Sequence, residues 1–226
     1  MPRKIAWTMD FGAAVWYNQA KTRGNTRMDE AAIYDRRSIR RFKQTELTQA
    51  LLRQIFDAGR VAPSAKNRQP WKYIVMTGAC KARFCDCMEA GIRREETQSA
   101  LLPRSRFGLP DAKNTLRIMR QAPVVAAVVN PNGLDPAAAL DADARFGEIC
   151  DSLSVGASVE NILLQAQRLG VGTLWIANTC FAYRELTAFL GEGGQLTGAI
   201  ALGYADEAPA ARARKAFAET VTFRSE

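Results

Sequence analysis

The stretch DRRSIRRF at positions 35–42 places four arginines around one serine, and we call Arg36, Arg37, Arg40 and Arg41 the arginine cluster. So dense a positive group repels itself unless something negative lies against it. Carboxylates, nucleic acid, a membrane surface and a bound phosphate are the candidates. Four carboxylates could pair with the cluster on a solvated face: Asp35, Glu46, Asp206 and Glu207. The stretch therefore indicates either anion binding or local ion pairing.

The 226-residue sequence contains no histidine. It therefore has no Ser-His or Cys-His nucleophile pair, no His-ligated zinc, and no side chain that titrates near neutral pH unless its pKa is shifted. An enzyme of this composition would depend on a cofactor for its chemistry. The spacing of Cys80, Cys85 and Cys87 fits neither zinc-ribbon nor ferredoxin patterns, so we expect no metal site.

The composition predicts one globular domain with an extension. A hydrophobic content of 47% is enough for a full core. No window reaches a membrane-spanning length of apolar residues, and the N-terminal stretch IAWTMDFGAAVWY is interrupted by Asp10, so neither a membrane span nor a secretory signal is expected. The five cysteines are odd in number and unevenly spread, which predicts reduced, mostly buried thiols. We expect a cytoplasmic protein.

The net charge of +8 makes nucleic acid a candidate partner. Half of that charge lies in residues 1–27, which contain five basic residues and one acidic residue. The remainder is concentrated in 36–43 and in ARARK at 211–215, without the interleaved aromatic side chains of a base-stacking surface. A general nucleic-acid surface is therefore not favoured.

Hydrophobic periodicity predicts alternating helices and strands. Five apolar residues share one face of a helix that we expect to begin with Thr45 as its N-cap: Leu47, Leu51, Leu52, Ile55 and Phe56. Strands are predicted at 71–77, 123–129, 172–177 and 196–204, and helices at 80–96, 141–170 and 181–190. Residues 101–110 are expected to be irregular because of their prolines and glycine. With no GxGxxG or P-loop motif, the pattern indicates an α+β or α/β fold.

Four blocks of the sequence, taken in order, resemble the nitroreductase family. They are RRSIRRF at 36–42, APSAKNRQPWKYIVM at 62–76, GASVENILLQAQRLGVGTLWI at 156–176 and GYADEAPAARARK at 203–215. The resemblance covers about residues 28–224. It implies an FMN-dependent, NAD(P)H-using homodimer with an α+β fold, in which helices surround a central, mostly antiparallel sheet and FMN lies at the dimer interface.

The resemblance also implies where the FMN phosphate binds. It places these residues among those that bind the cofactor at its phosphate end: Arg36, Ser38, Arg40, Arg212 and Arg214, with Arg37 beside them as a further cofactor-binding residue. In an extended stretch alternate side chains project to one side, so Arg36, Ser38 and Arg40 would converge on one phosphate. Arg37 and Arg41 would then point elsewhere. The two C-terminal arginines would close the site from the far end of the chain, and the charge of the phosphate would offset both basic groups.

Further residues are implied at the flavin ring: Pro63, Ser64, Asn67, Gln69, Asn114, Arg117, Ile176, Ala177 and Asn178. The bend at 63–70 would hold its polar side chains against the cofactor or the partner subunit, or it is an ordinary turn before a strand. Asn114 and Arg117 match an Asn and a basic residue that face the flavin pyrimidine, where a cation would stabilise negative charge. A plain surface helix is the alternative for these two.

The family pattern is imperfect at WIAN, residues 175–178. Several relatives have an acidic residue followed by Gly, where this chain has Ala177 and Asn178. Backbone contacts from Ile176 and Ala177 would survive this change, but an acidic side-chain contact would not. Residues 84–112 correspond to a variable lid, in which Arg106 and Phe107 are candidates for substrate contact.

The implied activity is ping-pong electron transfer from NAD(P)H through flavin N5 to nitroaromatic, quinone or similar acceptors. Flavin-fragmenting and dehalogenating enzymes share the scaffold and are the nearest enzymatic alternative. A non-catalytic flavin- or nucleic-acid-binding protein is the alternative from another class. In this interpretation no catalytic side chain, membrane or nucleic acid is required.

We expect the domain to occupy residues 28–226. The stretch MDEAAIYDRRS, beginning at Met28, reads like an ordinary start of the family, with Asp29 as a helix cap. Residues 1–27 have no clear periodicity and no matching motif. We interpret them as an N-terminal extension that is either disordered or the product of a misassigned start codon.

Overall fold

The computed structural model describes residues 32–225. The predictions for the 1–27 extension and for the Asp29 cap lie outside the described residues.

A four-stranded antiparallel sheet with strand order β1-β2-β4-β3 forms the centre of the molecule. Its strands are β1 (Lys72–Met76), β2 (Val124–Asn130), β3 (Gly172–Ile176) and β4 (Gln195–Gly203). All seven residues of β2 are buried, because β2 lies inside the sheet between β1 and β4 and both its faces are covered. The predicted strands and the antiparallel sheet are confirmed.

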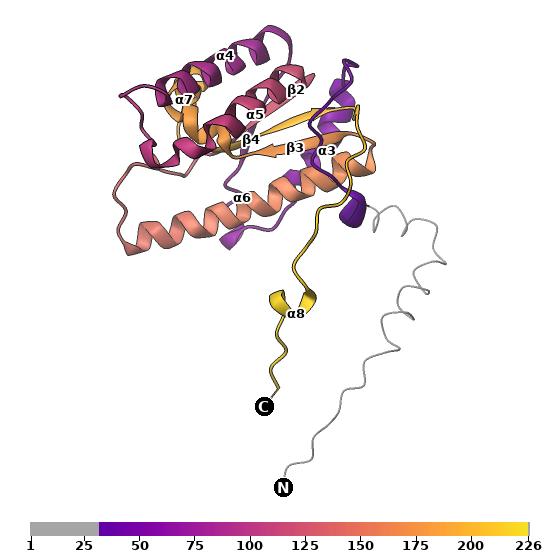
Figure 1. The fold of residues 1–226 in the computed structure, drawn as a ribbon. Coiled ribbons are helices and arrows are strands. Elements are labelled where there is room, and N and C mark those ends of the chain that lie inside the picture. The colour runs from indigo at the N-terminus through magenta and orange to yellow at the C-terminus, as the bar shows by residue number, and fades with distance from the viewer. Residues whose placement is uncertain (1–31, 226) are drawn as a thin grey trace.

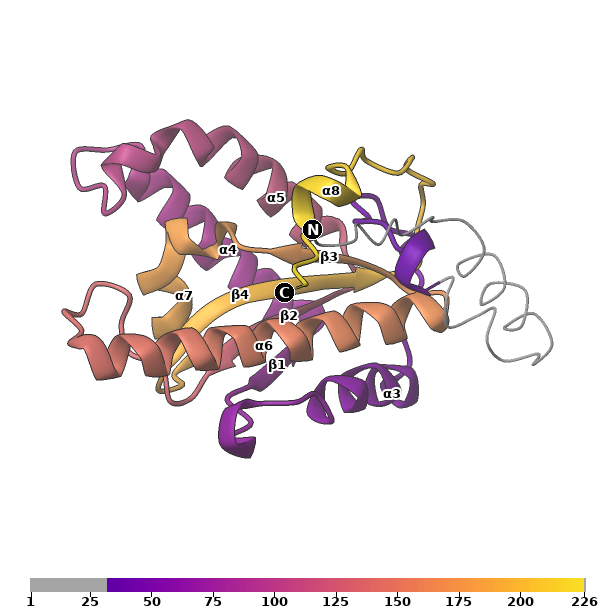
Figure 2. The same cartoon turned by 90° about the horizontal axis from the view of Figure 1, so that it is seen from below.

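Helices cover both faces of the sheet (Figures 1 and 2). The helices are α3 (Gln49–Arg60), α4 (Gly78–Glu95), α5 (Leu109–Gln121), α6 (Ala142–Arg168), α7 (Tyr183–Leu190) and α8 (Phe217–Thr220). Within residues 32–225, three short 3-10 helices accompany them: η2 (Ala65–Asn67), η3 (Pro103–Gly108) and η4 (Asn178–Ala182). Helices α3 and α6 pack on one face around Ile55 and Ile162, while α4, α5 and α7 pack on the other around Phe84 and Leu186. The result is an α+β sandwich.

The long α6 begins at an aspartate cap, since Asp141 Oδ1 accepts a hydrogen bond from Ala144 N at 2.8 Å. Its small residues allow α3 to approach closely. A Cβ atom on Gly59 of α3 would lie 2.7 Å from the Ile162 side chain, so a larger residue there would force Ile162 to shift. The Ser158 hydroxyl donates to Gly59 O at 2.6 Å across the same contact. This packing fixes the face of α6 that the candidate site uses.

Three expectations from the sequence are wrong in detail. Helix α3 begins at Gln49 and is capped by Thr48, whose Oγ1 accepts from Leu51 N at 3.2 Å, so Thr45 is not the cap. Residues 101–110 are more regular than expected, because Pro110 lies in the first turn of α5, where no backbone N–H donor is needed. The five thiols are free but not mostly buried: Cys85 is buried and Cys87 half-buried, while Cys80, Cys150 and Cys180 are exposed.

The C-terminal tail, residues 208–225, stands away from the body and carries α8 (Figure 1). Its aromatic residues Phe217 and Phe223 are exposed. Among the described residues, no helix combines the length and apolar character needed to cross a membrane.

Candidate flavin site

The arginine cluster runs beside the start of β3. Ile39 N donates to Thr173 O at 2.9 Å, and Ser38 and Thr173 form an isolated parallel bridge. Ile39 and Phe42 are buried, so the segment is anchored in the core while the arginines stay at the surface. The anchored segment therefore holds Ser38 beside one end of β3, which is an edge strand of the sheet.

The cluster's two pairs of arginines have different surroundings. Arg37 donates to two carbonyls, Tyr34 O at 2.7 Å and Arg36 O at 2.8 Å. Arg41 pairs with Glu207 at 3.6 Å. In contrast, Arg36 Nε lies 3.4 Å from Glu160 but is buried without a hydrogen bond of acceptable geometry.

Arg40 has spare donors as well. Its side chain donates to Ser38 O at 3.0 Å, and its backbone N–H donates to Glu207. A guanidinium has five N–H donors. Of the carboxylates named from the sequence, Glu207 is the one that pairs with the cluster in the described residues. Carboxylates therefore satisfy part of the cluster. The Arg36 Nε is itself too buried to reach a ligand, so the terminal nitrogens of Arg36 and Arg40 are the donors that fit an added anion such as a phosphate.

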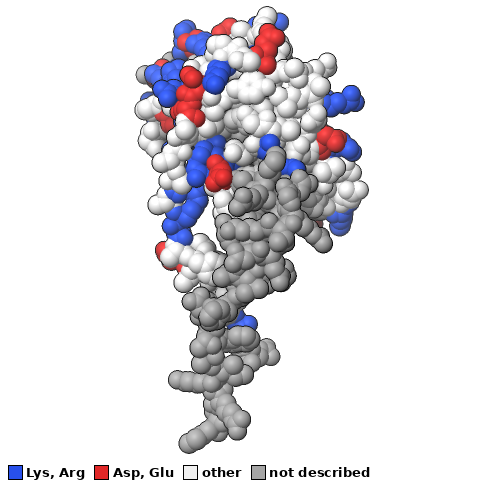
Figure 3. Space-filling model, turned by 90° about the vertical axis from the view of Figure 1, so that its right-hand side faces the viewer, with Lys and Arg blue, Asp and Glu red and all other residues white. Residues whose placement is uncertain are grey.

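Arg212 and Arg214 lie in the exposed tail. Arg214 donates weakly to Arg212 O and Ala213 O, each at 3.4 Å. In the described residues no hydrogen bond or ion pair connects these two arginines with the cluster. Figure 3 shows Lys and Arg in separate groups on this side of the molecule, with acidic side chains among them. Convergence of the two basic groups on one phosphate stays a prediction.

The end of β3 is tied to α5. The Asn178 amide donates to Asp111 Oδ2 at 2.7 Å and to Thr115 Oγ1 at 3.0 Å. Farther along α5, Arg117 donates to Asn114 Oδ1 at 2.9 and 3.2 Å, so its guanidinium is oriented. Residues 176–178 and the Asn114 and Arg117 pair are thus linked through one helix.

The two groups of predicted residues lie at opposite ends of β3. Ser38 is opposite Thr173. Ala177 follows four residues later, which corresponds to about 13 Å of extended chain. The edge of β3 therefore suits an elongated ligand that carries an anion at the arginine cluster.

A third group, the 64–69 loop, lies against α6. Lys66, Asn67 and Gln69 have left-handed φ angles of 52°, 54° and 50°. Each such residue costs roughly 1–2 kcal/mol relative to ordinary backbone. Strain of this kind persists where surrounding contacts enforce it and is concentrated at functional sites. The exposed Pro63 precedes this loop.

The lid candidates lie in η3. Phe107 is 87% exposed, and Arg106 donates to Thr97 O. The segment before η3 is fixed by three residues that we call the anchor network: Arg94, Glu95 and Glu185. Glu95 is fully buried and accepts from Leu101 N at 3.0 Å and Leu102 N at 2.9 Å.

Arg94 completes the anchor network. It donates to Glu95, to Glu185 Oε1 at 2.7 Å and to Phe181 O at 3.2 Å. Burial favours a raised pKa for Glu95, but the two backbone N–H donors and Arg94 outweigh it, so the pKa of Glu95 is lowered. The segment that contains the lid candidates is therefore attached to a hydrogen-bonded, ion-paired base.

Two buried acidic groups elsewhere stay protonated at neutral pH. Burial raises the pKa of Tyr73 to about 12, and the Tyr73 hydroxyl lies 2.6 Å from Ser158 Oγ. Burial raises the pKa of Cys85 to about 11. Neither group therefore supplies an anionic nucleophile at neutral pH, which is consistent with chemistry carried by a cofactor.

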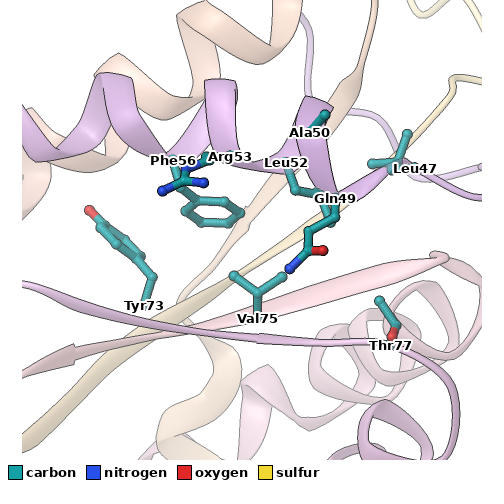
Figure 4. Close-up of a pocket in the computed structure, with 9 residues that line it drawn as sticks. All are labelled: Leu47, Gln49, Ala50, Leu52, Arg53, Phe56, Tyr73, Val75 and Thr77. Carbon is teal, nitrogen blue, oxygen red and sulfur yellow. The ribbon is translucent and has the colours of Figure 1, made fainter.

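A cavity of about 980 Å³ lies apart from the residues predicted for the flavin site. It is a groove between α3 and the outer edge of β1, lined by apolar side chains such as Leu52, Phe56 and Val75 (Figure 4). Only one basic side chain, Arg53, lines it, and none of the predicted site residues does. The chemistry of the donors, rather than cavity size, places the candidate site along β3.

Several contacts of the site were not predicted from the sequence. Glu160 pairs with Arg36, and Asp151 pairs with Arg68 of the 64–69 loop. The available signal was that Asp151 falls on the buried face of an otherwise apolar helix pattern. A buried carboxylate requires a partner, but the sequence alone could not say which cation supplies it.

Comparisons with known proteins agree with this geometry. A profile described as the nitroreductase family matches residues 33–204. A Bacillus subtilis (strain 168) protein that carries the provisional name NAD(P)H nitroreductase YfhC is 24% identical over 185 residues, covering 80% of this chain and 87% of that protein.

Two solved structures share the fold. The FMN-dependent nitroreductase NfnB from Mycobacterium smegmatis in complex with NADPH has a TM-score of 0.67 and 21% identity, covering 88% of this chain and 99% of that one. A BluB-like flavoprotein from Clostridium difficile 630 has a TM-score of 0.67 and 24% identity, covering 87% and 98%. The chain therefore belongs to the nitroreductase family. As a member, it is an oxidoreductase with the family's α+β fold.

Proposed function

We propose that this protein binds FMN and transfers electrons from NAD(P)H to a small acceptor by a ping-pong mechanism. The observation that carries the proposal is the spare hydrogen-bonding capacity of Arg36 and Arg40 at one end of β3. The names of its relatives, an FMN-dependent nitroreductase studied with NADPH among them, support the choice of cofactor and donor. Nitroaromatics, quinones and similar compounds are the acceptors we propose.

The chain's own residues bind and orient the cofactor. Arg36, Ser38 and Arg40 would hold the phosphate, with Arg37 beside them and Arg212 and Arg214 joining from the tail. Bound FMN would supply the hydride chemistry that no side chain here provides. Two groups would contact the ring: Pro63, Ser64, Asn67 and Gln69 in one, and Asn114, Arg117, Ile176, Ala177 and Asn178 in the other.

We further propose a homodimer with the flavin in its interface. Helix α6 presents an exposed apolar stripe, in which Phe146, Ile149 and Leu153 are 68%, 45% and 71% exposed. Their i, i+3, i+7 spacing places them on one side of the helix. Trp175 of β3 and the tail residue Phe217 are also exposed. Light scattering should give about twice the 24.9 kDa chain mass, and a mass of one chain would refute the dimer.

The remaining parts of the proposal are a cytoplasmic location, a nitroreductase-like FMN-binding domain of residues 28–226 and a dispensable N-terminal extension. Membranes and nucleic acid are not proposed as partners. A flavin-fragmenting or dehalogenating activity would use the same binding residues, and so would a flavin-binding protein without turnover.

Anaerobic reduction of the purified protein tests the function. The protein should be yellow, release FMN on acid treatment, and lose its flavin absorbance when NADH or NADPH is added. Absorbance should return on adding p-benzoquinone or a nitroaromatic. Recovery of FAD, or of no flavin, would overturn the cofactor assignment. Bound FMN that neither NADH nor NADPH bleaches would overturn the oxidoreductase proposal in favour of a passive binder.

A further inference from the structure

The strained 64–69 loop needs an external support. Lys66, Asn67 and Gln69 all have φ between 50° and 54°, a region that non-glycine residues keep only under constraint. Inside the loop, Gln69 N donates to Ser64 Oγ at 3.0 Å. That bond closes the loop on itself but does not attach it to the body of the protein.

Arg68, between two of the left-handed residues, attaches the loop to α6. Its Nε donates to Asp151 Oδ1 at 3.1 Å, a terminal nitrogen donates to the same oxygen, and that nitrogen also donates to Gly147 O at 3.3 Å. The Asp151 side chain is only 6% exposed. In the described residues Arg68 is its one ionic partner, and a buried carboxylate that loses its partner is strongly unfavourable. Asp151 therefore keeps Arg68 in place.

A second contact fixes the start of the loop. Ala65 N donates to Ser154 Oγ at 3.3 Å, and Ser154 Oγ donates to Cys150 O at 2.7 Å. Ser154 follows Asp151 by three residues, so both side chains lie on one face of α6. The loop is thus attached at two points to a single rigid surface.

We propose that the Arg68 and Asp151 pair is a clamp that positions the flavin-contacting loop. It rests on the proposed FMN binding, because it holds Ser64, Asn67 and Gln69 in the conformation in which they would contact the ring. Arg68 and Asp151 are positioning residues and need no contact with the flavin. A loop that is already ordered binds its ligand more tightly than one that must be ordered on binding.

Limited trypsin digestion of the flavin-free protein tests the clamp without any cofactor. Asp151→Asn should raise the rate of cleavage after Lys66 and Arg68 about tenfold, because the loop opens more often. The matched control is Asp57→Asn, which breaks the exposed ion pair between Asp57 and Arg60 on α3. Mass spectrometry should locate the new cuts in the loop. Unchanged cleavage in the loop would overturn the clamp.

A double-mutant cycle on flavin affinity supplies the second arm. Arg68→Gln and Asp151→Asn should each weaken FMN binding about tenfold, and the double variant should also lose about tenfold rather than a hundredfold, because the pair acts as one unit. Riboflavin should lose as much as FMN, since the loop faces the ring and not the phosphate. A double variant whose loss of affinity equals the product of the two single losses would refute the proposal. Variants that bind FMN more weakly but bind riboflavin as tightly as the wild-type protein would also refute it.

Two further measurements cover the cases in which Asp151→Asn does not fold or the wild-type protein binds no FMN. If Asp151→Asn does not fold, Arg68→Lys is measured instead, because Arg68 is the partly exposed member of the pair. Arg68→Lys should weaken FMN binding measurably but by less than about tenfold, and unchanged FMN binding would count against the clamp. If the wild-type protein binds no FMN, the proposed function fails, while the trypsin experiment still decides whether the clamp orders the loop.

Discussion

The anchor network and the arginine cluster differ in how completely their charged groups are hydrogen-bonded. Glu95 is fully buried, yet its carboxylate accepts hydrogen bonds from Leu101, Leu102 and Arg94. In the cluster, Arg36 keeps a buried Nε without a hydrogen-bond partner. Charges that complete their partners within the chain stabilise the fold, whereas a charged group whose donors are not all hydrogen-bonded has capacity left for a ligand.

Breaking the anchor network should have the largest effect on stability. Arg94→Met leaves Glu95 buried without its cation, so we expect the free energy of unfolding to fall by about 3–5 kcal/mol. Urea denaturation measures this. The FMN dissociation constant of the folded protein should stay unchanged. A stable Arg94→Met variant would mean that the network is not structural.

Arg36→Ala and Arg40→Ala test the arginine cluster. Each should weaken FMN binding by about 1.5–3 kcal/mol, or roughly tenfold to somewhat over a hundredfold, the usual contribution of a charge-assisted hydrogen bond. Titration of flavin-free protein, followed by flavin fluorescence, gives the constants. Unfolding free energies should change little, and a large loss of stability would place these arginines with the anchor network instead.

Acid should weaken the anchor network through Glu95. Its pKa in the folded protein lies below the ordinary value of 4.5, so the stabilisation is complete above that value and is lost as pH falls below it. Glu185 contributes in the same direction, because Arg94 lowers its pKa against the effect of burial. Urea midpoints measured between pH 7 and pH 3 should decline less steeply in Glu95→Gln. Equal slopes would contradict the assignment.

Arg37→Ala and Arg41→Ala should have much smaller effects than Arg36→Ala and Arg40→Ala. Their side chains already pair with nearby carbonyls and with Glu207. We expect each to change FMN binding by less than about 1 kcal/mol, as for exposed ion pairs. The same fluorescence titration applies. Equal losses at all four positions would mean that the cluster acts only as a diffuse positive field.

Removing residues 1–27 should have the smallest effect. A chain beginning at Met28 should fold and bind FMN as tightly as the full chain, because the family match begins only at residue 33. Loss of flavin from the shortened chain would show that the extension is part of the site.

Elements defined by local pattern could be predicted from the sequence, and contacts between distant residues could not. The unbroken apolar run of β2 predicted a strand buried on both faces, and it is one. Thr45 was the wrong cap because Thr45 and Thr48 both satisfy the same local pattern, and only the fold selects Thr48. Thiol burial was overestimated because the outward direction of Cys150 and Cys180 depends on how whole helices pack.

The candidate site shows the same division. The sequence motifs identified the residues of the arginine cluster and of the 64–69 loop as candidates for the site. The partners that decide their behaviour lie far away in the sequence: Asp151 is 83 positions from Arg68, and Glu207 is 167 positions from Arg40. Such pairings arise from topology, so periodicity and spacing contain no signal for them.

The central claim is that Arg36 and Arg40 bind the phosphate of FMN, and the ratio of two dissociation constants tests it most directly. Riboflavin has the same ring but no phosphate, so its dissociation constant divided by that of FMN measures the phosphate's contribution alone. In the wild-type protein this ratio should be well above ten, and in the Arg36→Ala/Arg40→Ala double variant it should fall by at least about tenfold. A ratio that is equally large in both proteins would contradict the assignment of the phosphate to the arginine cluster.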